Sequence, residues 1–146
     1  MNFATNRLMI RHPRVEDAED IFINYAQDVE VTKYLTWVPH KELKDTQRWV
    51  QYCVANANTD SSLMFVLCLK ETAEVIGMID FRLEGFKAHF GFVLAKKYWN
   101  QGLMTEAMQP LIEYFNENPN IYRLWAAHDI ENEASGKVML KLGMRC

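Results

Sequence analysis

The chain has 146 residues, of which 49% are hydrophobic and 24% charged, the usual size and composition of one soluble domain. The formal net charge of -3, with lysine and arginine scattered along the chain, excludes the basic footprint of a nucleic-acid-binding protein. No apolar run reaches the roughly 18 residues that a membrane helix needs, and the first residues lack the apolar core of a signal peptide. We therefore expect a single cytoplasmic domain over residues 1–146 that binds neither nucleic acid nor a membrane.

Hydrophobic periodicity predicts the order β-α-α-α-β-β-β-α-β-α, which favours a mixed α/β sheet with helices on both faces. The expected strands are 7–12, 63–70, 74–84, 88–95 and 123–129. The expected helices are 15–27, 29–35, 46–58, 104–118 and 131–143. Asp45 is predicted to cap the third helix, and Pro110 is predicted to fall in the second turn of the fourth.

Three cysteines, Cys53, Cys68 and Cys146, give an odd count. The first two lie inside apolar patterns, which is typical of small buried hydrophobic residues in a reducing compartment. No Cys-x-x-Cys or paired histidine spacing predicts a metal site.

The stretch YWNQGLMTEAM, residues 98–108, predicts a turn that leads into a helix. The first N–H groups of a helix have no intrahelical acceptor, and the helix dipole adds positive charge at that end. Together with the glycine at 102, which allows close approach, these donors can hold a phosphate or diphosphate. The alternative is an ordinary turn whose N–H groups face water.

The same stretch resembles a known family when it is taken with its neighbours. The sequences GFVLAKKYWNQGLMTEA and ENEASGKVMLKLGM, with TNRLMIRHPRVEDAEDIF, YLTWVPH and IGMIDF, are similar to the GCN5-related N-acetyltransferase (GNAT) superfamily. Within it, the similarity is to the Rim-type branch of ribosomal-protein alanine N-acetyltransferases. The resemblance runs along nearly the whole chain and implies the GNAT fold, with acetyl-CoA as co-substrate and an amine as acceptor.

The resemblance implies a cofactor site on two elements. The pantetheine arm would add to the edge of the fourth family strand, here Phe92, Val93 and Leu94. The diphosphate motif falls on Trp99, Asn100, Gln101, Gly102, Leu103, Met104 and the following Thr105. Trp99 stands where Gln or Arg is usual, and Met104, where a small residue is usual, must point its side chain away from the phosphates.

The last predicted helix carries the family's Asn-x-x-Ser as Asn132 and Ser135. Asn132 would contact the pantetheine arm, or else act as an N-cap. Ser135 would contact the cofactor and serve as the catalytic acid, because Met139 occupies the place of the tyrosine that many family members use. Ser135 as a small residue for close packing is the alternative.

The candidates for the catalytic base are His89 and Asp80, of which His89 has the more useful ordinary pKa. The alternative for His89 is an ordinary surface or core histidine. A backbone N–H near Leu94 could stabilise the oxyanion, and Glu106 is expected to hold the helix start rather than to move protons. His128 is a weaker candidate for the base. Trp37, Pro39 and His40 lie in a loop that forms part of the acceptor cleft in this branch; the alternative for Trp37 is an aromatic side chain packed under the loop.

Members of this branch continue past the last helix into two more strands, whereas this chain stops at Cys146. We therefore expect a sheet that lacks its last C-terminal strands, with an unpaired edge on the strand that carries Trp125. A homodimer is one way to cover that edge. The function expected is an acetyl-CoA-dependent N-acetyltransferase; the alternative is an acyl-CoA-binding sensor domain without turnover.

Overall fold

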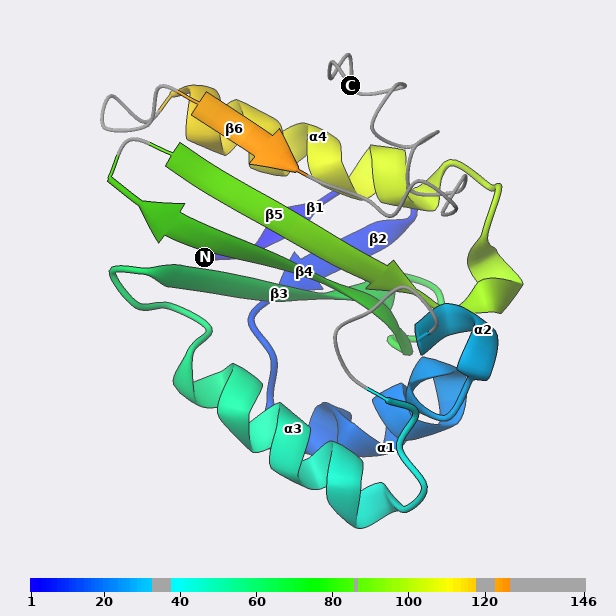
Figure 1. Ribbon diagram of the computed structural model, residues 1–146. Helices are drawn as coiled ribbons and strands as arrows, with labels where there is room; N and C mark the ends of the chain where they lie inside the picture. The colour runs from blue at the N-terminus through cyan, green and yellow to red at the C-terminus, as the bar shows by residue number, and fades with distance from the viewer. Residues whose placement is uncertain (33–37, 86, 118–122, 127–146) are drawn as a thin grey trace.

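A six-stranded sheet forms the centre of the molecule in a computed structural model, which describes residues 1–32, 38–85, 87–117 and 123–126, the last four by their backbone alone. The strands lie in chain order from β1 to β6. The adjacent pairs from β1 to β5 are antiparallel, and β6 runs parallel to β5. Figure 1 shows all the strands of this sheet. They are β1 (Phe3–Ala4), β2 (Leu8–Arg11), β3 (Ser62–Leu69), β4 (Val75–Glu84), β5 (Lys87–Leu94) and β6 (Arg123–Ala126).

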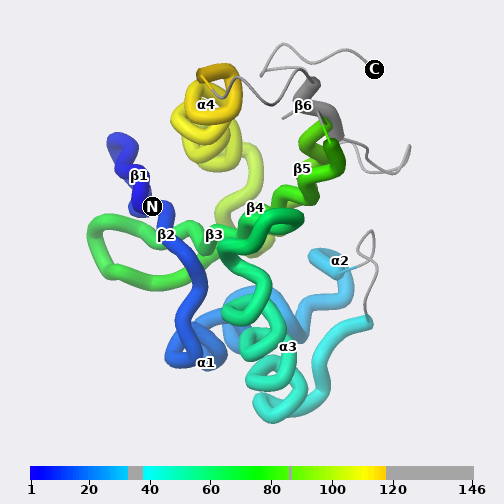
Figure 2. The backbone as a smooth tube through the Cα atoms, turned by 90° about the vertical axis from the view of Figure 1, so that its left-hand side faces the viewer, coloured from blue at the N-terminus to red at the C-terminus, as the bar shows by residue number. Residues whose placement is uncertain are grey.

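Helices cover both faces of this sheet, as the sequence predicted. One face carries α4 (Leu103–Asn116), and the other carries α1 (Ala18–Ile21) and α3 (Leu43–Ala55) (Figure 2). The short helix α2 (Val29–Thr32) lies beside the end of β5 (Figure 1). The mixed α/β fold with helices on both faces is confirmed.

The expected helix over 15–27 is broken into three kinds of turn. A 3-10 segment η1 (Val15–Asp17) leads into α1, and a π segment η2 (Phe22–Ala26) follows it. Of the residues predicted at helical spacing to face the core, Ala18, Ile21 and Tyr25 are buried, whereas Val15 is 53% exposed. The apolar face was thus predicted in part, and the number of residues in each turn was not.

The prediction that Asp45 caps the third helix is wrong. Helix α3 begins at Leu43, three residues before the expected start at residue 46, with Glu42 as its N-cap. The Asp45 carboxylate turns back and accepts the N–H groups of Glu42 and Lys41 at 3.2 and 3.3 Å. Asp45 therefore closes a capping box from inside the first turn.

Helix α4 begins at Leu103 with Gly102 as its N-cap, one residue before the expected start. Pro110 is consequently the eighth residue of the helix, just past its second turn. A proline there cannot donate to the carbonyl oxygen of Glu106.

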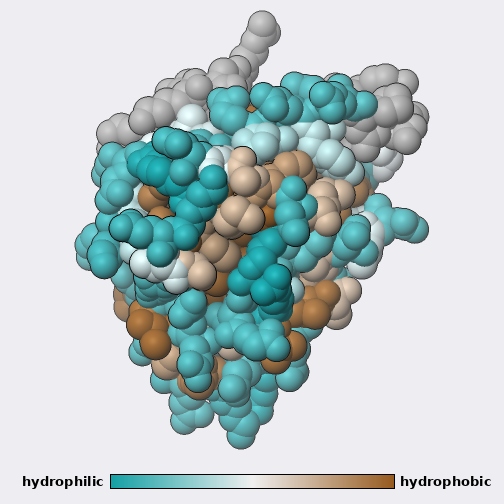
Figure 3. All heavy atoms as spheres, turned by 180° about the vertical axis from the view of Figure 1, so that it is seen from behind, coloured by the Kyte–Doolittle hydropathy of each residue, from teal (hydrophilic) through white to brown (hydrophobic). Residues whose placement is uncertain are grey.

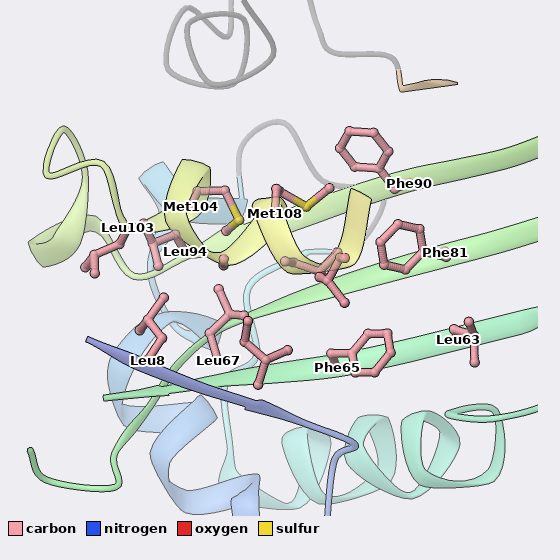
Figure 4. Close-up of a cluster of buried hydrophobic side chains, with 14 of the residues drawn as sticks. Leu8, Leu63, Phe65, Leu67, Phe81, Phe90, Leu94, Leu103, Met104 and Met108 are labelled. Atoms are coloured by element: carbon pink, nitrogen blue, oxygen red, sulfur yellow. The ribbon is translucent and has the colours of Figure 1, made fainter. Parts of the chain in front are cut away.

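The core on the α4 face is rich in aromatic and methionine side chains. Phe65, Phe81 and Phe90 from three neighbouring strands point toward Met104 and Met108 of α4 (Figure 4). The ring of Phe81 lies 6.1 Å from that of Phe65, 5.9 Å from that of Phe90 and 4.5 Å from that of Phe115. This packing fixes α4 against the strands that precede it in the chain.

The core on the opposite face joins α1 and α3 to the sheet. It contains Cys53 and Cys68, both buried and free of disulfide bonds, as the sequence predicted. The expected helix 131–143, the end of the strand 123–129, the second half of the helix 29–35, Cys146 and the expected loss of C-terminal strands lie outside the described residues.

Candidate functional site

Strand β5 extends past its pairing with β6. The parallel pairing runs from Lys87 opposite Arg123 to Phe90 opposite Ala126. The last four residues of β5, 91–94, pair within the described part of the chain with β4 alone. The two strands lie side by side in Figure 1, and the described pairing ends halfway along β5.

The direction of the backbone groups follows from strand alternation. The N–H of Ala95 donates to the carbonyl oxygen of Ile76 at 2.8 Å, so the groups of Leu94, one residue earlier, point away from β4. The groups of Phe92 point the same way, and those of Val93 point toward β4. Of the three residues predicted to bind pantetheine, Phe92 and Leu94 thus present main-chain groups on the β6 side.

Trp99 occupies one of these outward groups. Its indole Nε1–H donates to the carbonyl oxygen of Leu94 at 2.7 Å. Sequence reasoning placed Trp99 in the diphosphate motif and missed this contact. Within the described part of the chain, the outward groups of this edge left without a partner are the N–H and C=O of Phe92 and the N–H of Leu94.

The loop between β5 and α4 has an unusual backbone. It opens with the 3-10 segment η3 (Lys96–Tyr98), and both Asn100 and Gly102 then adopt positive φ, at 61° and 76°. Asparagine and glycine tolerate this left-handed region best. The side chain of Gln101 folds back and donates to the carbonyl oxygen of Lys97 at 3.1 Å.

The start of α4 follows directly. The first helical hydrogen bond runs from the N–H of Glu106 to the carbonyl oxygen of Gly102 at 3.0 Å, so the N–H groups of the residues before Glu106 have no intrahelical acceptor. The side chains of Leu103 and Met104 are each 2% exposed and pack in the core. Met104 therefore leaves the loop side of the helix start open, as the sequence required.

Thr105 lies in the same turn. Its hydroxyl oxygen is buried without a hydrogen-bond partner in the described part of the structure.

Glu106 holds the helix start in place, which confirms its predicted role. Its carboxylate accepts hydrogen bonds from Thr5 Oγ1 at 2.6 Å and from the backbone N–H and Nε of Arg7, both at 2.9 Å. Partial burial alone would raise the pKa of Glu106, but these hydrogen bonds and the Arg7 charge outweigh it, and the pKa is lowered. Sequence reasoning missed Thr5 and Arg7, because no local pattern links them to a residue about a hundred positions away.

The two candidate bases share one face of the sheet, opposite α4. Asp80 pairs with Gly91 across β4 and β5, and Arg82 pairs with His89 two positions further. A Cβ atom at position 91 would lie 3.2 Å from Asp80 Oδ1, so the glycine leaves room beside this carboxylate. Burial raises the pKa of Asp80, and the charges of Arg82 and His89 oppose the shift in part.

His40, predicted to lie in the acceptor cleft, is held by contacts with elements other than the strands of Asp80 and His89. The ring nitrogen Nδ1 of His40 lies 2.6 Å from Thr46 Oγ1, and its backbone N–H donates to Ala26, so His40 ties its loop to α3 and η2. Burial lowers the pKa of His40. Trp37, His128, Asn132, Ser135 and Met139 lie outside the described residues.

An ion pair links the loop before α4 to α2. Lys96 Nζ contacts the carboxylate of Glu30, and both side chains are about half exposed or more, at 48% and 63%. The loop that precedes Gly102 is therefore tied to the short helix at the end of β5 as well as to Arg7, just before β2.

Within the described ranges, no group of three or more His, Cys, Asp or Glu side chains could hold a metal ion. None of the helices described is long and apolar enough to cross a membrane. The face seen in Figure 3 is largely hydrophilic, with apolar side chains gathered in a band across its middle.

Over residues 7–145 the sequence matches the family described as the acetyltransferase (GNAT) domain. The chain belongs to this family. The match spans both halves of the candidate site, the edge of β5 and the start of α4. The recognition made from the motifs is thereby confirmed.

Relatives of this GNAT chain include named N-acetyltransferases. The uncharacterized N-acetyltransferase p20 of Bacillus licheniformis is 32% identical over 144 residues, which cover 97% of this chain and 80% of that protein. The [ribosomal protein uS5]-alanine N-acetyltransferase of Escherichia coli is 25% identical, with 98% of this chain and 77% of that protein covered. The expected similarity to ribosomal-protein alanine acetyltransferases is therefore present at modest identity.

Solved GNAT structures share the fold. A GNAT acetyltransferase from Bacillus anthracis superposes with a TM-score of 0.87 at 28% identity, covering 99% of this chain and 84% of that one. A microcin self-immunity acetyltransferase, solved in complex with acetyl-CoA and AMP, has a TM-score of 0.84 at 18% identity, with 94% and 78% covered. At that identity the second comparison concerns the fold alone.

Proposed function

We propose that this GNAT chain is a single domain that transfers an acetyl group from acetyl-CoA to a primary amine, either a protein N-terminus or a small-molecule amine. The observation that carries the proposal is the continuity of two binding elements. The outward main-chain groups of β5 lead within ten residues into the positive-φ loop and the open helix start. A single long ligand with an amide-containing arm and a diphosphate fits this order.

The pantetheine arm pairs with β5 as an added strand, since strand addition uses main-chain groups that lack a neighbour. The N–H and C=O of Phe92 supply its partners. The diphosphate binds the N–H groups of Gly102, Leu103, Met104 and Thr105, where the helix dipole favours negative charge. Trp99, Asn100 and Gln101 shape the loop, and Asn132 and Ser135 complete the contacts to the arm.

The transfer occurs by direct attack in a ternary complex. The amine loses a proton to His89, its nitrogen forms a bond to the thioester carbon, and the carbon–sulfur bond breaks. The N–H of Leu94 stabilises the negative charge that develops on the carbonyl oxygen. Ser135 gives a proton to the departing CoA thiolate, and Asp80, beside Gly91, is the alternative base.

Two measurements test the proposal on the full chain. Isothermal titration calorimetry with acetyl-CoA measures binding, and a thiol-release assay over a panel of amines and N-terminal peptides measures turnover. We expect binding together with release of thiol by at least one acceptor. Binding without thiol release would favour the acyl-CoA sensor, and absence of binding would overturn both readings.

Single substitutions test the role of each catalytic candidate. His89→Ala should reduce the turnover number while acetyl-CoA still binds. The same measurements on Asp80→Asn test the alternative base. Ser135→Ala should lower turnover more than binding. The reverse result would make Ser135 a residue that only holds the cofactor.

A further inference from the structure

The N-terminal segment before β2 is bound to the start of α4 by one carboxylate. Glu106 accepts hydrogen bonds from Thr5 Oγ1 at 2.6 Å, the Arg7 backbone N–H at 2.9 Å and Arg7 Nε at 2.9 Å. Thr5 Oγ1 also accepts from the N–H of Leu8 at 3.1 Å, so the hydroxyl is held from two sides. These bonds connect segments about a hundred residues apart in sequence.

Arg7 makes a second contact, to the loop itself. Its Nη2 donates to the carbonyl oxygen of Gln101 at 3.1 Å, while its Nε is bound to Glu106. A Cβ atom placed on Gly102 would lie 3.8 Å from the same Nη2. One guanidinium group therefore lies against the loop. It donates to Gln101, just before Gly102, and to Glu106, in the first turn of the helix after it.

The bond to Gln101 sets the direction of a donor. The carbonyl of Gln101 and the N–H of Gly102 belong to one planar trans peptide group, so they point in opposite directions. When Arg7 holds the carbonyl oxygen on its own side, the N–H of Gly102 must point away from Arg7. This N–H is the first of the donors at the start of α4 that have no intrahelical acceptor.

The ion pair also offsets an unfavourable charge. Glu106 lies in the first turn of α4, close to the N–H groups that would receive a diphosphate, and an uncompensated carboxylate there would repel an anion. Arg7 lies against this carboxylate at 2.9 Å. Its side chain is 45% exposed, so its worth as a surface ion pair alone is small.

From these contacts we propose that Thr5, Arg7 and Glu106 are positioning residues for the diphosphate-binding loop. Arg7 orients the Gly102 peptide, Glu106 fixes the guanidinium, and Thr5 fixes the carboxylate. The inference rests on the proposed function, because it needs a ligand with a diphosphate at this helix start. A purely structural role would only tie the N-terminal segment to the domain.

The experiment compares CoA with pantetheine, which lacks the diphosphate and the nucleotide. Dissociation constants are measured by NMR titration on the full chain, which tolerates weak binding, for the wild type and for Arg7→Gln, Thr5→Val and Glu106→Gln. Thr5→Ser keeps the hydroxyl and serves as the conservative variant. Arg48→Gln, at an exposed position on α3, is the control for the same loss of charge.

Loss of a hydrogen bond to a charged group should weaken CoA binding about tenfold or more in Arg7→Gln and Glu106→Gln. Binding of pantetheine should stay unchanged, Thr5→Ser should retain most of the affinity that Thr5→Val loses, and Arg48→Gln should bind both ligands like the wild type. Equal weakening for CoA and pantetheine, or no weakening for CoA, would overturn the inference. If Arg7→Gln does not fold, the comparison of Thr5→Val with Thr5→Ser decides in the same way.

A wild-type chain that does not bind CoA would refute the proposed function, and the inference with it. If the wild type binds CoA and Arg7→Gln binds it with equal affinity, the inference alone is refuted.

Discussion

The indole N–H of Trp99 donates to the carbonyl oxygen of Leu94 at 2.7 Å, five residues back along the chain. Leu94 ends β5 and Trp99 follows the η3 turn, so this bond folds the loop before α4 onto the end of the strand. It also occupies an outward acceptor on the edge that is proposed to pair with pantetheine. The two halves of the candidate site are thus held at a fixed relative position.

Trp99→Phe tests this bond, because it keeps an aromatic ring and removes the donor. The free energy of unfolding should fall by about 1 kcal/mol, the usual net worth of one hydrogen bond. Affinity for CoA should fall by about twofold to tenfold as the loop loses its fixed position. Urea denaturation and calorimetry measure the two quantities, and unchanged values for both would show that the bond contributes little in solution.

The left-handed conformation of Gly102 predicts a graded response to substitution. Gly102→Ala meets no close atom, since its Cβ would lie 3.8 Å from Arg7, but it must adopt a φ of 76°. The cost should be about 1–2 kcal/mol of stability, and less than the cost of a β-branched residue. Gly102→Val should in addition abolish CoA binding, because its side chain fills the space beside the helix start.

Thermal unfolding and CoA titration of the two variants separate strain from obstruction. Gly102→Ala should lose stability and keep measurable binding, whereas Gly102→Val should lose both. Equal CoA affinity in Gly102→Val and wild type would remove the helix start from the binding site.

Much of the fold followed from the sequence because its central strands are almost continuously apolar and its turns carry clear signals. Strand β1 was missed, since Phe3–Ala4 is too short for any periodicity and exists through its pairing with β2. Asp45 accepts the N–H groups of residues before it instead of acting as the N-cap, and this depends on the direction of its side chain, which composition does not show. The segment 22–26 forms a π turn, which no local pattern reveals.

The elements of the candidate site could be located from the sequence where they are local, and not where they depend on distant residues; their binding of acetyl-CoA stays a prediction. The loop with Gly102 and the strand with Phe92 lie together in sequence, so a short pattern identified them. The contacts of Arg7 with Gln101 and Glu106 join residues more than ninety positions apart, and only the folded chain brings them together. Trp99 was recognised as a motif position, but its bond to Leu94 depends on the path of the loop.

The aromatic cluster under α4 predicts a large loss of stability from one truncation. Phe81 is fully buried, and its ring contacts those of Phe65, Phe90 and Phe115. Phe81→Ala should lower the free energy of unfolding by about 3–5 kcal/mol, the range for deletion of a buried phenylalanine ring. In a urea titration, Phe81→Leu should lower the free energy of unfolding by less than Phe81→Ala does. A loss in Phe81→Ala no larger than that of a substitution at an exposed position would contradict the packing described.

Asp80 predicts a stability difference that depends on pH. Burial raises the pKa of its carboxyl in the folded state above the ordinary value of 3.8. Ionisation is therefore less favourable in the folded than in the unfolded chain, and the free energy of unfolding decreases as the pH rises from the ordinary pKa through the folded one. Asp80→Asn removes this cost, so the variant should unfold at a higher temperature than the wild type at pH 7.

The difference in melting temperature should shrink as the pH falls and vanish below the ordinary carboxyl pKa, where Asp80 is protonated in both states. Asp60→Asn, at an exposed turn before β3, provides the matched control for the same chemical change. Thermal unfolding followed by circular dichroism between about pH 3 and pH 8 spans the window in which carboxyl groups titrate. A wild type more stable than Asp80→Asn at neutral pH would mean that Asp80 ionises favourably in the folded chain, through contacts with Arg82 and His89 stronger than the burial they oppose.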